Sequence, residues 1–429
     1  MSLNLNQSLH LFDDAIRRIP SGTQTFSKGW TQYPFGVSPL FAEKADGCFV
    51  WDVDGNKFVD WPMALGPIIL GYNYASVNEA VKAQIDKGVT FSLPHRKEIE
   101  LAEKLCEIIP CAEMVRFGKN GSDATSGAVR CARAYTGRNI IACCGYHGWQ
   151  DWYIGTTTRA LGIPMAIRDL TLTFEYNNLA SLERLFSLYP DQIACVILEP
   201  VGLEPPQDDF LAKINQIARN NGALVIYDEC WTGFRWAIGG AQEFFEVTPD
   251  IACFGKALGN GFPISVIVGC SDIMKIFDEI FYSFTFGGDL VGITAGLAVI
   301  KELVVTNALA YIWKMGKMLI DGINTLIKKY ALEQRIYLKG YPPKFFVFFK
   351  DKEGNDDLLL KSVVQQEMIE RGFLYAGYHV ISFSHTENVI AQTLDAYNQI
   401  FSLIQNKHES EELKLLLKGK MVKPVFRKH

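Results

Sequence analysis

The middle of the chain alternates short, wholly apolar runs with segments of helical periodicity, and this alternation constrains the fold more than any other feature. Between the first two runs, the segment Phe210–Asn221 places apolar residues at helical spacing. The runs are rich in β-branched or aromatic residues: Ile193–Leu198, Ala223–Tyr227, Ile251–Phe254 and Ser265–Val268. Strands that are apolar on both faces and joined by helices are typical of a mostly parallel sheet covered on both sides. We therefore predict an α/β fold.

The texture of the sequence changes near both ends of the chain. From about Asn307 the pattern becomes one long helix over Ala308–Tyr330, strand-like runs within Arg335–Lys350 and a closing helix over Glu387–Ile404. Near the start, two β runs flank Asp54-Gly55-Asn56, which is a strong hairpin signal. We predict three parts: an N-terminal segment (residues 1–60) that packs with the small domain, a large domain (61–305), and a small C-terminal α+β domain with an extra tail (306–429). After about Lys407 the simplest interpretation is a solvated helix and a frayed end.

Composition excludes several classes of function. The chain has 429 residues, of which 48% are hydrophobic, and its net charge is −5. This composition supports a large core and gives no reason to expect a nucleic acid or membrane partner. We see no secretory signal and no apolar run near the roughly 20 residues that a bilayer requires. The ten cysteines are scattered without a Cys-x-x-Cys pair, so we expect no metal and a reducing, cytoplasmic location.

The segment Phe117–Ala124 reads Phe-Gly-Lys-Asn-Gly-Ser-Asp-Ala and leads into a helical pattern. A Gly-Ser turn at the start of a helix presents backbone N–H groups, a hydroxyl and the positive end of the helix dipole, which together suit a phosphate. The segment is not a P-loop, because no Ser or Thr follows Gly-Lys at the required place. Taken alone, it is better explained by Ser122 acting as an ordinary helix cap.

Two charged residues follow buried runs at positions where an α/β sheet binds ligands. Asp228 follows Ala223–Tyr227, and a carboxylate there could keep a cofactor's ring nitrogen protonated. A structural acid that caps the next turn is an equal alternative. Lys256 follows Ile251–Phe254 in a glycine-rich stretch, where partial desolvation would let its amine condense with an aldehyde. For that segment alone, a surface lysine in a flexible turn is the simpler interpretation.

Two further segments carry weaker signals. Gly145-Tyr146-His147-Gly148 follows an apolar run, and an aromatic side chain at a strand end can stack on a flat ring. Ordinary packing with one satisfied hydrogen bond is the alternative for Tyr146 and His147. The turn Ser283–Gly288 combines small residues with the hydroxyl of Thr285. Together, all these segments fit one ligand, a flat, phosphorylated pyridine that carries an aldehyde.

The order and texture of these segments resemble the class III, fold-type I aminotransferases, which depend on pyridoxal 5′-phosphate (PLP). Within that family the closest resemblance is to the glutamate-1-semialdehyde 2,1-aminomutases, and it covers about Ile19 to Ile404. The stretches that carry it are Glu43–Gly47, Arg133–Arg138, Asp228–Arg235 and Pro249–Lys256. The resemblance implies a large PLP-binding domain with a mostly parallel seven-stranded sheet, a smaller α+β domain, and a homodimer with shared active sites.

The resemblance also assigns roles residue by residue. Lys256 would attach the cofactor through its aldehyde and move the substrate proton. Asp228 would hold the pyridine nitrogen protonated, and Tyr146 would stack on the ring. The remaining cofactor contacts would come from Asn120, Gly121 and Ser122 at the phosphate, Cys230 against the ring, Glu199 near the cofactor, and Thr285 at the phosphate of the other subunit's cofactor.

The match fails where the family binds substrate. Lys28 stands in place of an arginine that resembles a clamp for the substrate carboxylate, and a lysine cannot make the bidentate contact. The lid region after Tyr153 and the segment Tyr375–Val380 are shortened, and the family's active-site glutamate has no evident counterpart. Our candidate substrate residues are Lys28, Trp30 and His147, with Lys119, Trp149 and Trp152 as further basic or aromatic additions.

We therefore predict a PLP-dependent aminotransferase that moves an amino group between an amino acid donor and a keto or aldehyde substrate. The leading hypothesis for the substrate is a sugar or sugar derivative used for surface glycan synthesis. The alternatives are the aminomutase, which is an isomerase, another PLP reaction such as decarboxylation or racemisation, and a non-catalytic binding protein of the same fold. The presence of both Lys256 and Asp228 disfavours the last. A nicotinamide oxidoreductase would need a Gly-x-Gly-x-x-Gly fingerprint that the chain lacks.

Overall fold

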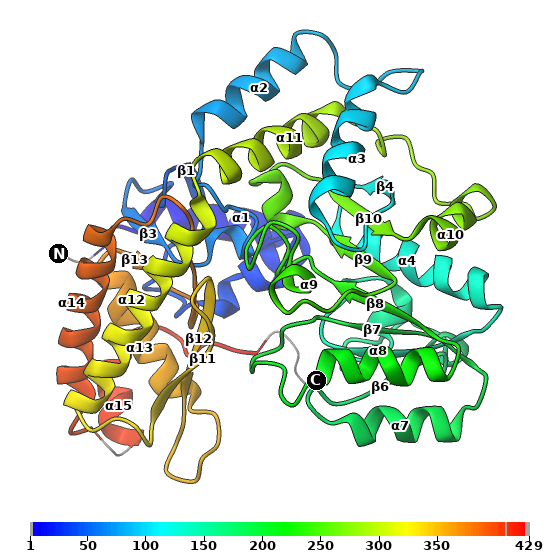
Figure 1. The fold of residues 1–429 in the computed structure, drawn as a ribbon. Helices are drawn as coiled ribbons and strands as arrows, with labels where there is room; N and C mark the ends of the chain where they lie inside the picture. Colours follow the sequence, from blue (N-terminus) through cyan, green and yellow to red (C-terminus); the bar gives the residue numbers. More distant parts are fainter. Residues whose placement is uncertain (1–2, 408–409, 425–429) are drawn as a thin grey trace. The chain divides into compact units, whose positions relative to one another are not determined.

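The computed structural model describes residues 3–407 and 410–424, which form two compact units (Figure 1). The first, which we call the central unit, consists of residues 75–309. The second, which we call the terminal unit, combines residues 3–74 with the described residues from 310 onward.

The central unit is built on a seven-stranded sheet with the strand order β4-β10-β9-β8-β7-β5-β6. Neighbouring strands are parallel except at β10, which runs antiparallel to both β4 and β9. The strands are β4 (Met114–Gly118), β5 (Ile140–Cys144), β6 (Thr171–Thr173), β7 (Ile193–Leu198), β8 (Leu224–Asp228), β9 (Ile251–Phe254) and β10 (Ser265–Gly269). The predicted α/β fold with a mostly parallel seven-stranded sheet is confirmed.

The middle strands of this sheet are covered on both faces. All six residues of β7 are buried, which explains why its sequence is apolar without alternation. The helices of the central unit are α2 (Ala75–Ile85), α3 (Arg96–Ile108), α4 (Gly121–Thr136), α5 (Asp151–Ile154), α6 (Met165–Arg168), α7 (Leu179–Leu188), α8 (Phe210–Asn220), α9 (Ala241–Phe244), α10 (Ser271–Met274) and α11 (Leu290–Val305).

Helix α4 packs on the sheet through small residues, and this contact fixes where the helix begins. Ala124, Ala128 and Ala132 are fully buried in a cluster with residues of the strands. A Cβ added to Gly127 would lie 2.6 Å from Ile267 Cδ1, so only a glycine allows this approach. The N-terminus of α4 follows β4 directly and is therefore held rigidly at one edge of the sheet.

The terminal unit contains two small, mostly antiparallel sheets, one of which joins segments distant in sequence. The expected hairpin around Asp54-Gly55-Asn56 is present, and β13 pairs in parallel with β3, so both ends of the chain share one sheet. The sheet orders are β1-β2-β3-β13 and β11-β12-β14. The strands are β1 (Ala42–Asp46), β2 (Phe49–Asp52), β3 (Lys57–Asp60), β11 (Ile336–Tyr341), β12 (Lys344–Phe349), β13 (Phe373–Leu374) and β14 (Tyr378–Val380). The helices are α1 (Asn6–Arg18), α12 (Ala308–Lys329), α13 (Leu358–Glu370), α14 (Glu387–Ile404) and α15 (Ser410–Leu416).

Within the described ranges, no single helix is both long and apolar enough to cross a membrane. Helices α11 and α12 reach that length and composition only as a pair with a break between them.

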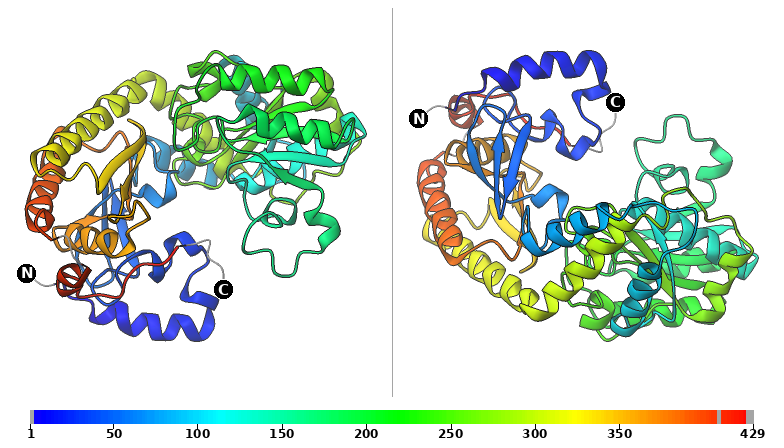
Figure 2. Two further views of the ribbon diagram at one scale, coloured as in Figure 1. Left: turned by 90° about the horizontal axis from the view of Figure 1, so that it is seen from below. Right: turned by 90° about the horizontal axis from the view of Figure 1, so that it is seen from above.

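The prediction of a solvated, frayed tail is wrong for the part that the structure describes. Helix α15 packs against α13, and Leu413 and Val422 are only 2% and 3% exposed. Backbone hydrogen bonds then connect the last described residues to the N-terminal segment, and Figure 2 shows the two segments running side by side. Residues 408–409 and 425–429, which belong to the same predicted tail, lie outside the described residues.

Candidate active site

The predicted catalytic and cofactor-binding residues of the central unit come from strand ends at one edge of its sheet. Asp228 ends β8, Glu199 follows β7, and Tyr146 follows β5. These three strands are consecutive neighbours and parallel, so their carboxyl ends lie together. The start of α4 follows β4 at the same edge, as expected for a ligand site in an α/β sheet.

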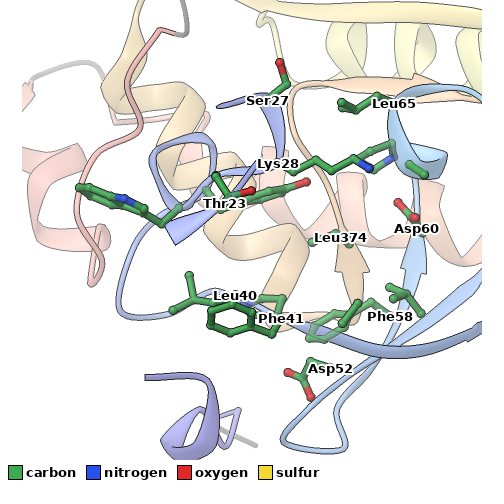
Figure 3. Close-up of a pocket in the computed structure, with 18 of the residues that line it drawn as sticks. Thr23, Ser27, Lys28, Leu40, Phe41, Asp52, Phe58, Asp60, Leu65 and Leu374 are labelled. Carbon is green, nitrogen blue, oxygen red and sulfur yellow. The ribbon is translucent and has the colours of Figure 1, made fainter. Parts of the chain in front are cut away.

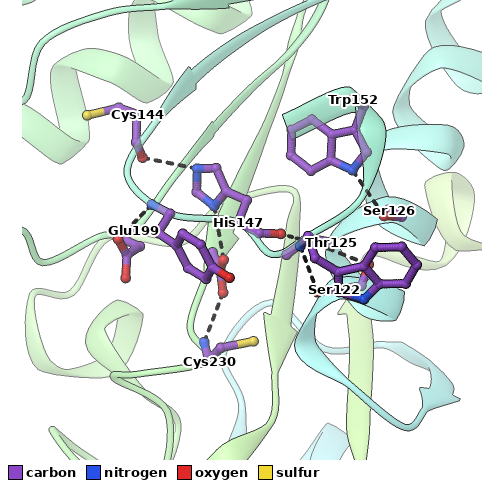
Figure 4. Close-up of polar contacts among 11 residues, drawn as sticks. Ser122, Thr125, Ser126, Cys144, His147, Trp152, Glu199 and Cys230 are labelled. Carbon is purple, nitrogen blue, oxygen red and sulfur yellow. Dashed lines mark hydrogen bonds and ion pairs between the residues drawn. The ribbon is translucent and has the colours of Figure 1, made fainter. Parts of the chain in front are cut away.

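Asp228 is held as a carboxylate by a buried histidine (Figure 4). Its Oδ2 lies 2.9 Å from Nδ1 of His147, and its Oδ1 accepts a hydrogen bond of 3.1 Å from the Cys230 amide. Burial would raise the pKa of Asp228, but the hydrogen bond and charge of His147, and the charge of Lys256, hold that pKa below its ordinary value. The carboxylate is therefore ionised at neutral pH.

His147 has a partner at each ring nitrogen. Its Nε2 lies 3.1 Å from the backbone carbonyl of Cys144. Its Nδ1 lies 2.9 Å from Oδ2 of the ionised Asp228. These two contacts fix the orientation of the buried ring.

His147 does not fill the substrate role that the sequence suggested. Its side chain is fully buried, and both of its nitrogens are engaged by Asp228 and Cys144. We reassign it as a positioning residue that orients and ionises Asp228. The sequence showed a strand-end histidine, but it could not show that the ring turns inward to a residue 81 positions away.

Lys256 occupies a strained backbone position directly after β9. Its φ is +42°, in the left-handed region, where a residue with a side chain costs roughly 1–2 kcal/mol. Its Nζ lies 4.5 Å from the centre of the Trp231 ring, which can stabilise the ammonium form by a cation–π contact. Strain at a residue of this kind is typical of functional sites.

The start of α4 is capped in a way that leaves its first amides available to a ligand. Asn120 is the N-cap, and Asp123 Oδ2 accepts hydrogen bonds from the Asn120 and Lys119 amides. The simple interpretation of Ser122 as the helix cap is therefore wrong. Ser122 Oγ instead accepts a 3.2 Å hydrogen bond from the Trp149 amide. The Gly121 and Ser122 amides open the helix and have no carbonyl partner within it.

Glu199 and Tyr146 form the side of the site next to Asp228. Glu199 Oε2 accepts a 3.0 Å hydrogen bond from the Tyr146 amide, which fixes the backbone at this turn. The Tyr146 ring is 47% exposed and packs edge-on against Tyr153. An exposed ring held by a rigid turn can cover the face of a flat ligand.

The residues present fit PLP, because their chemistry matches its groups and close packing holds them in place. A Cβ at Gly148 would lie 2.2 Å from Ser122 Oγ, and a Cβ at Gly121 would lie 2.8 Å from Cys230 Sγ. The cradle thus combines helix amides for a phosphate, an ionised acid for a ring nitrogen, and a lysine for an aldehyde.

Substituting Gly148 with alanine tests the cradle. We expect the variant to bind PLP about tenfold more weakly or worse, because the new methyl group collides with Ser122 in addition to straining the backbone. Gly137→Ala is the matched control: it also has a positive φ, at the far end of the same helix, but nothing lies within 4 Å of its Cβ. Titration of the apoprotein with PLP, followed by absorbance, gives both dissociation constants. Equal constants for the two variants would contradict this account.

Three of the other candidates lie elsewhere. Thr285 is on an exposed turn of the central unit, between the exposed rings of Phe284 and Phe286. Lys28 and Trp30 belong to the terminal unit, where both line a cavity of about 420 Å³ (Figure 3).

Two of the additional substrate candidates are engaged by the protein itself. Lys119 Nζ lies 3.3 Å from Asp289 Oδ2 and 3.3 Å from the Pro263 carbonyl. Trp152 is buried and donates its indole N–H to Ser126 Oγ at 3.0 Å.

Trp231 is a site residue that the sequence interpretation missed. It is three positions beyond Asp228, within the stretch Asp228–Arg235 that carries the family resemblance. Its place in that stretch was the one signal that could have identified it. Its contact with Lys256 depends on how β8 and β9 lie side by side, which the sequence does not show locally.

Comparison with known proteins agrees with this arrangement. Residues 33–404 match the family described as Aminotransferase class-III. A glutamate-1-semialdehyde 2,1-aminomutase of Methanocaldococcus jannaschii is 35% identical over 94% of this chain and 99% of its own length. A 3-aminobutyryl-CoA aminotransferase of Cloacimonas acidaminovorans is 34% identical over 92% of this chain and 97% of its own. Among solved structures, the PLP form of the FumI protein of Sphingopyxis sp. MTA144 has a TM-score of 0.87 at 27% identity, covering 95% and 99% of the two chains.

Proposed function

The chain belongs to the class III aminotransferases, which are PLP-dependent enzymes, and from this premise we propose that it transfers an amino group from an amino acid donor to a keto or aldehyde sugar derivative. The observation that carries the proposal is the ionised Asp228, held by His147 in the same unit as the strained Lys256. When bound, PLP supplies an electron sink for the carbon that carries the amino group.

Each site residue then has a proposed task. Lys256 holds the cofactor's aldehyde carbon and moves a proton to or from the substrate carbon through Nζ. Asp228 keeps the pyridine nitrogen protonated. We also propose that the phosphate is bound by Asn120, Gly121 and Ser122. The ring would contact Tyr146 and Cys230, and Glu199 would hold the turn that carries Tyr146.

The cavity of the terminal unit supports an acceptor without a carboxylate clamp. Asp60 and Lys28 both line it, and in Figure 3 the Lys28 side chain extends toward Asp60. Burial raises the pKa of Asp60 to about 6, against the opposing effects of the Tyr72 hydrogen bond and of Lys28. At neutral pH Asp60 is thus mostly ionised and offsets the charge of Lys28.

A cavity with this charge balance suits a hydroxylated ligand better than a ligand that carries a carboxylate. Asp52 also lines it, so acidic groups outnumber the one lysine, and the rings of Trp30 and Tyr33 can cover the apolar face of a sugar. Lys28 and Trp30 therefore remain our proposed substrate-binding residues.

The aminomutase reaction is the second candidate, because a relative of that name is 35% identical to this chain. A relative named as an aminotransferase is 34% identical, so overall identity does not separate the two reactions. Lys28 in place of the arginine of the aminomutases favours an aminotransferase.

A homodimer in the cytoplasm completes the proposal. The exposed rings of Phe281, Phe284 and Phe286 surround Thr285 on the central unit, and a second copy would cover them. Thr285 would then reach the cofactor phosphate of that copy. The cytoplasmic location is supported by the cysteines, all ten of which are free.

The test compares substrates for the purified protein loaded with PLP. With glutamate as donor, we expect turnover of at least one keto sugar nucleotide or keto sugar phosphate, and turnover of glutamate semialdehyde at least about 100-fold slower. Lys28→Arg should narrow that gap by about tenfold, because the guanidinium group restores bidentate binding of a carboxylate. Rapid conversion of glutamate semialdehyde without a donor, and none of any keto sugar, would establish the aminomutase instead.

A further inference from the structure

Helix α13 of the terminal unit carries buried polar side chains that hydrogen-bond to two distant backbone segments. Every residue from Ser362 to Ile369 is buried, although the run contains Gln365 and Gln366. A helix buried on all sides normally lacks such residues. In this helix, the polar side chains bond to the last part of the chain and to the segment after Trp30.

Those last residues, 417–424, we call the C-terminal strap. Gln366 Oε1 accepts hydrogen bonds from the Lys418 amide (2.8 Å) and the Gly419 amide (3.2 Å), and its Nε2 donates to the Leu416 carbonyl (2.9 Å). Further on, the buried Val422 donates its amide to Ser362 Oγ at 3.1 Å. The strap is therefore seated on α13 along its length.

The other side of the strap binds the N-terminal segment. The Lys420 amide donates to the Phe35 carbonyl at 2.9 Å, and the Lys423 amide donates to the Thr31 carbonyl at 2.8 Å. Gln32 Nε2 returns a 3.0 Å hydrogen bond to the Lys423 carbonyl. A Cβ at Gly419 would lie 2.7 Å from Val37 Cγ2 and 3.0 Å from the Phe35 carbonyl, so the contact is close throughout.

The bound segment is a wall of the cavity. Lys28, Trp30 and Tyr33 line the cavity, whereas Thr31 and Gln32, between the last two, face the strap. The wall itself consists of short turns, in which helical bonds give little support. The strap lies beyond residues 33–404, the part of the chain that matches the family.

We propose that the C-terminal strap positions the wall formed by residues 28–33 and thereby sets the affinity of the cavity for substrate. The strap acts through the wall, to which its backbone is hydrogen-bonded. The proposal rests on the proposed function only in taking the cavity as the substrate-binding cavity.

Two variants test it in the PLP-loaded protein. The first ends after Leu417 and keeps α15. The second, Gly419→Val in the full chain, pushes the strap from Val37 and Phe35. Met421→Val is the matched control, because it places the same side chain on an exposed position of the strap. Hydrogen–deuterium exchange of residues 28–35 reports on the wall directly, and exchange of residues 121–136 reports on the cradle.

We expect exchange in the wall to rise about tenfold in both variants, with the cradle and the Met421→Val protein unchanged. In the half-reaction with glutamate, the concentration that gives half the maximal rate should rise about fivefold, while the maximal rate stays within about twofold. A purely structural role would lower the maximal rate as well as the affinity for glutamate. Unchanged exchange in the wall, or an equal fall in rate at all glutamate concentrations, would overturn the proposal. If glutamate does not react even with the intact protein, the proposed function fails, and exchange in the wall alone then decides the role of the strap.

Discussion

A Lys256→Ala enzyme is expected to lose transamination by about 10⁴-fold or more, because one side chain both holds the cofactor and moves the proton. The fold should survive, since alanine meets the same strain as lysine at φ +42° and β9 beneath it is unchanged. Steady-state rates with glutamate as donor measure the loss, and the PLP content after gel filtration shows whether the helix amides alone retain the cofactor.

Lys213→Ala is the control for this prediction, because Lys213 is an exposed lysine on α8 of the same unit. That variant should keep its activity within about twofold, as is usual for surface substitutions. If Lys256→Ala retained a tenth of the wild-type rate, another base would have to move the proton, and the assignment of Lys256 would be wrong.

Asp228→Asn should lower kcat/KM by about 10²–10³-fold, because the amide has nearly the same shape but cannot keep a ring nitrogen protonated. The substitution also replaces the charged partner of the buried His147 with a neutral amide. We therefore expect the melting temperature to fall as well, because a hydrogen bond to an ionised acceptor is stronger than one to a neutral acceptor. Kinetics and thermal unfolding of the PLP-loaded variant measure the two effects.

Asp250→Asn is the matched control for Asp228→Asn. Asp250 lies directly before β9, where its Oδ2 accepts a 2.7 Å hydrogen bond from the Val225 amide, and an asparagine can accept the same bond. Activity of that control should stay within about threefold of wild type. Similar losses in both variants would mean that Asp228 acts through stability, without a specific effect on the cofactor ring.

The sheet of the central unit could be predicted because its signal is local. Strands β7 and β9 and helix α14 have the predicted bounds, β10 and α8 differ by one residue at one end, and β8 is shifted by one residue at both ends. Each of these strands is a short apolar run bounded by polar residues, and burial on both faces accounts for that pattern. Asp228 and Lys256 could be proposed for the same reason, because each directly follows such a run.

The contacts that refine the site could not be predicted, because they join distant segments. The His147–Asp228 pair spans 81 positions, and nothing in either local sequence shows that the imidazole ring meets the carboxylate. The strap bonds to Thr31 from the far end of the chain, whereas the charged composition after about Lys407 predicts a solvated tail. Burial of a few apolar side chains, such as Leu413 and Val422, outweighed that composition.

The most direct test of the central claim is to reduce the PLP-loaded protein with borohydride and map the modified tryptic peptide by mass spectrometry. Reduction makes the bond between the cofactor and its lysine permanent, and trypsin no longer cuts there. We predict one pyridoxyl group on the peptide of residues 236–275, with the missed cleavage at Lys256. A pyridoxyl group on another lysine such as Lys119, or no modified peptide from protein saturated with PLP, would contradict the account.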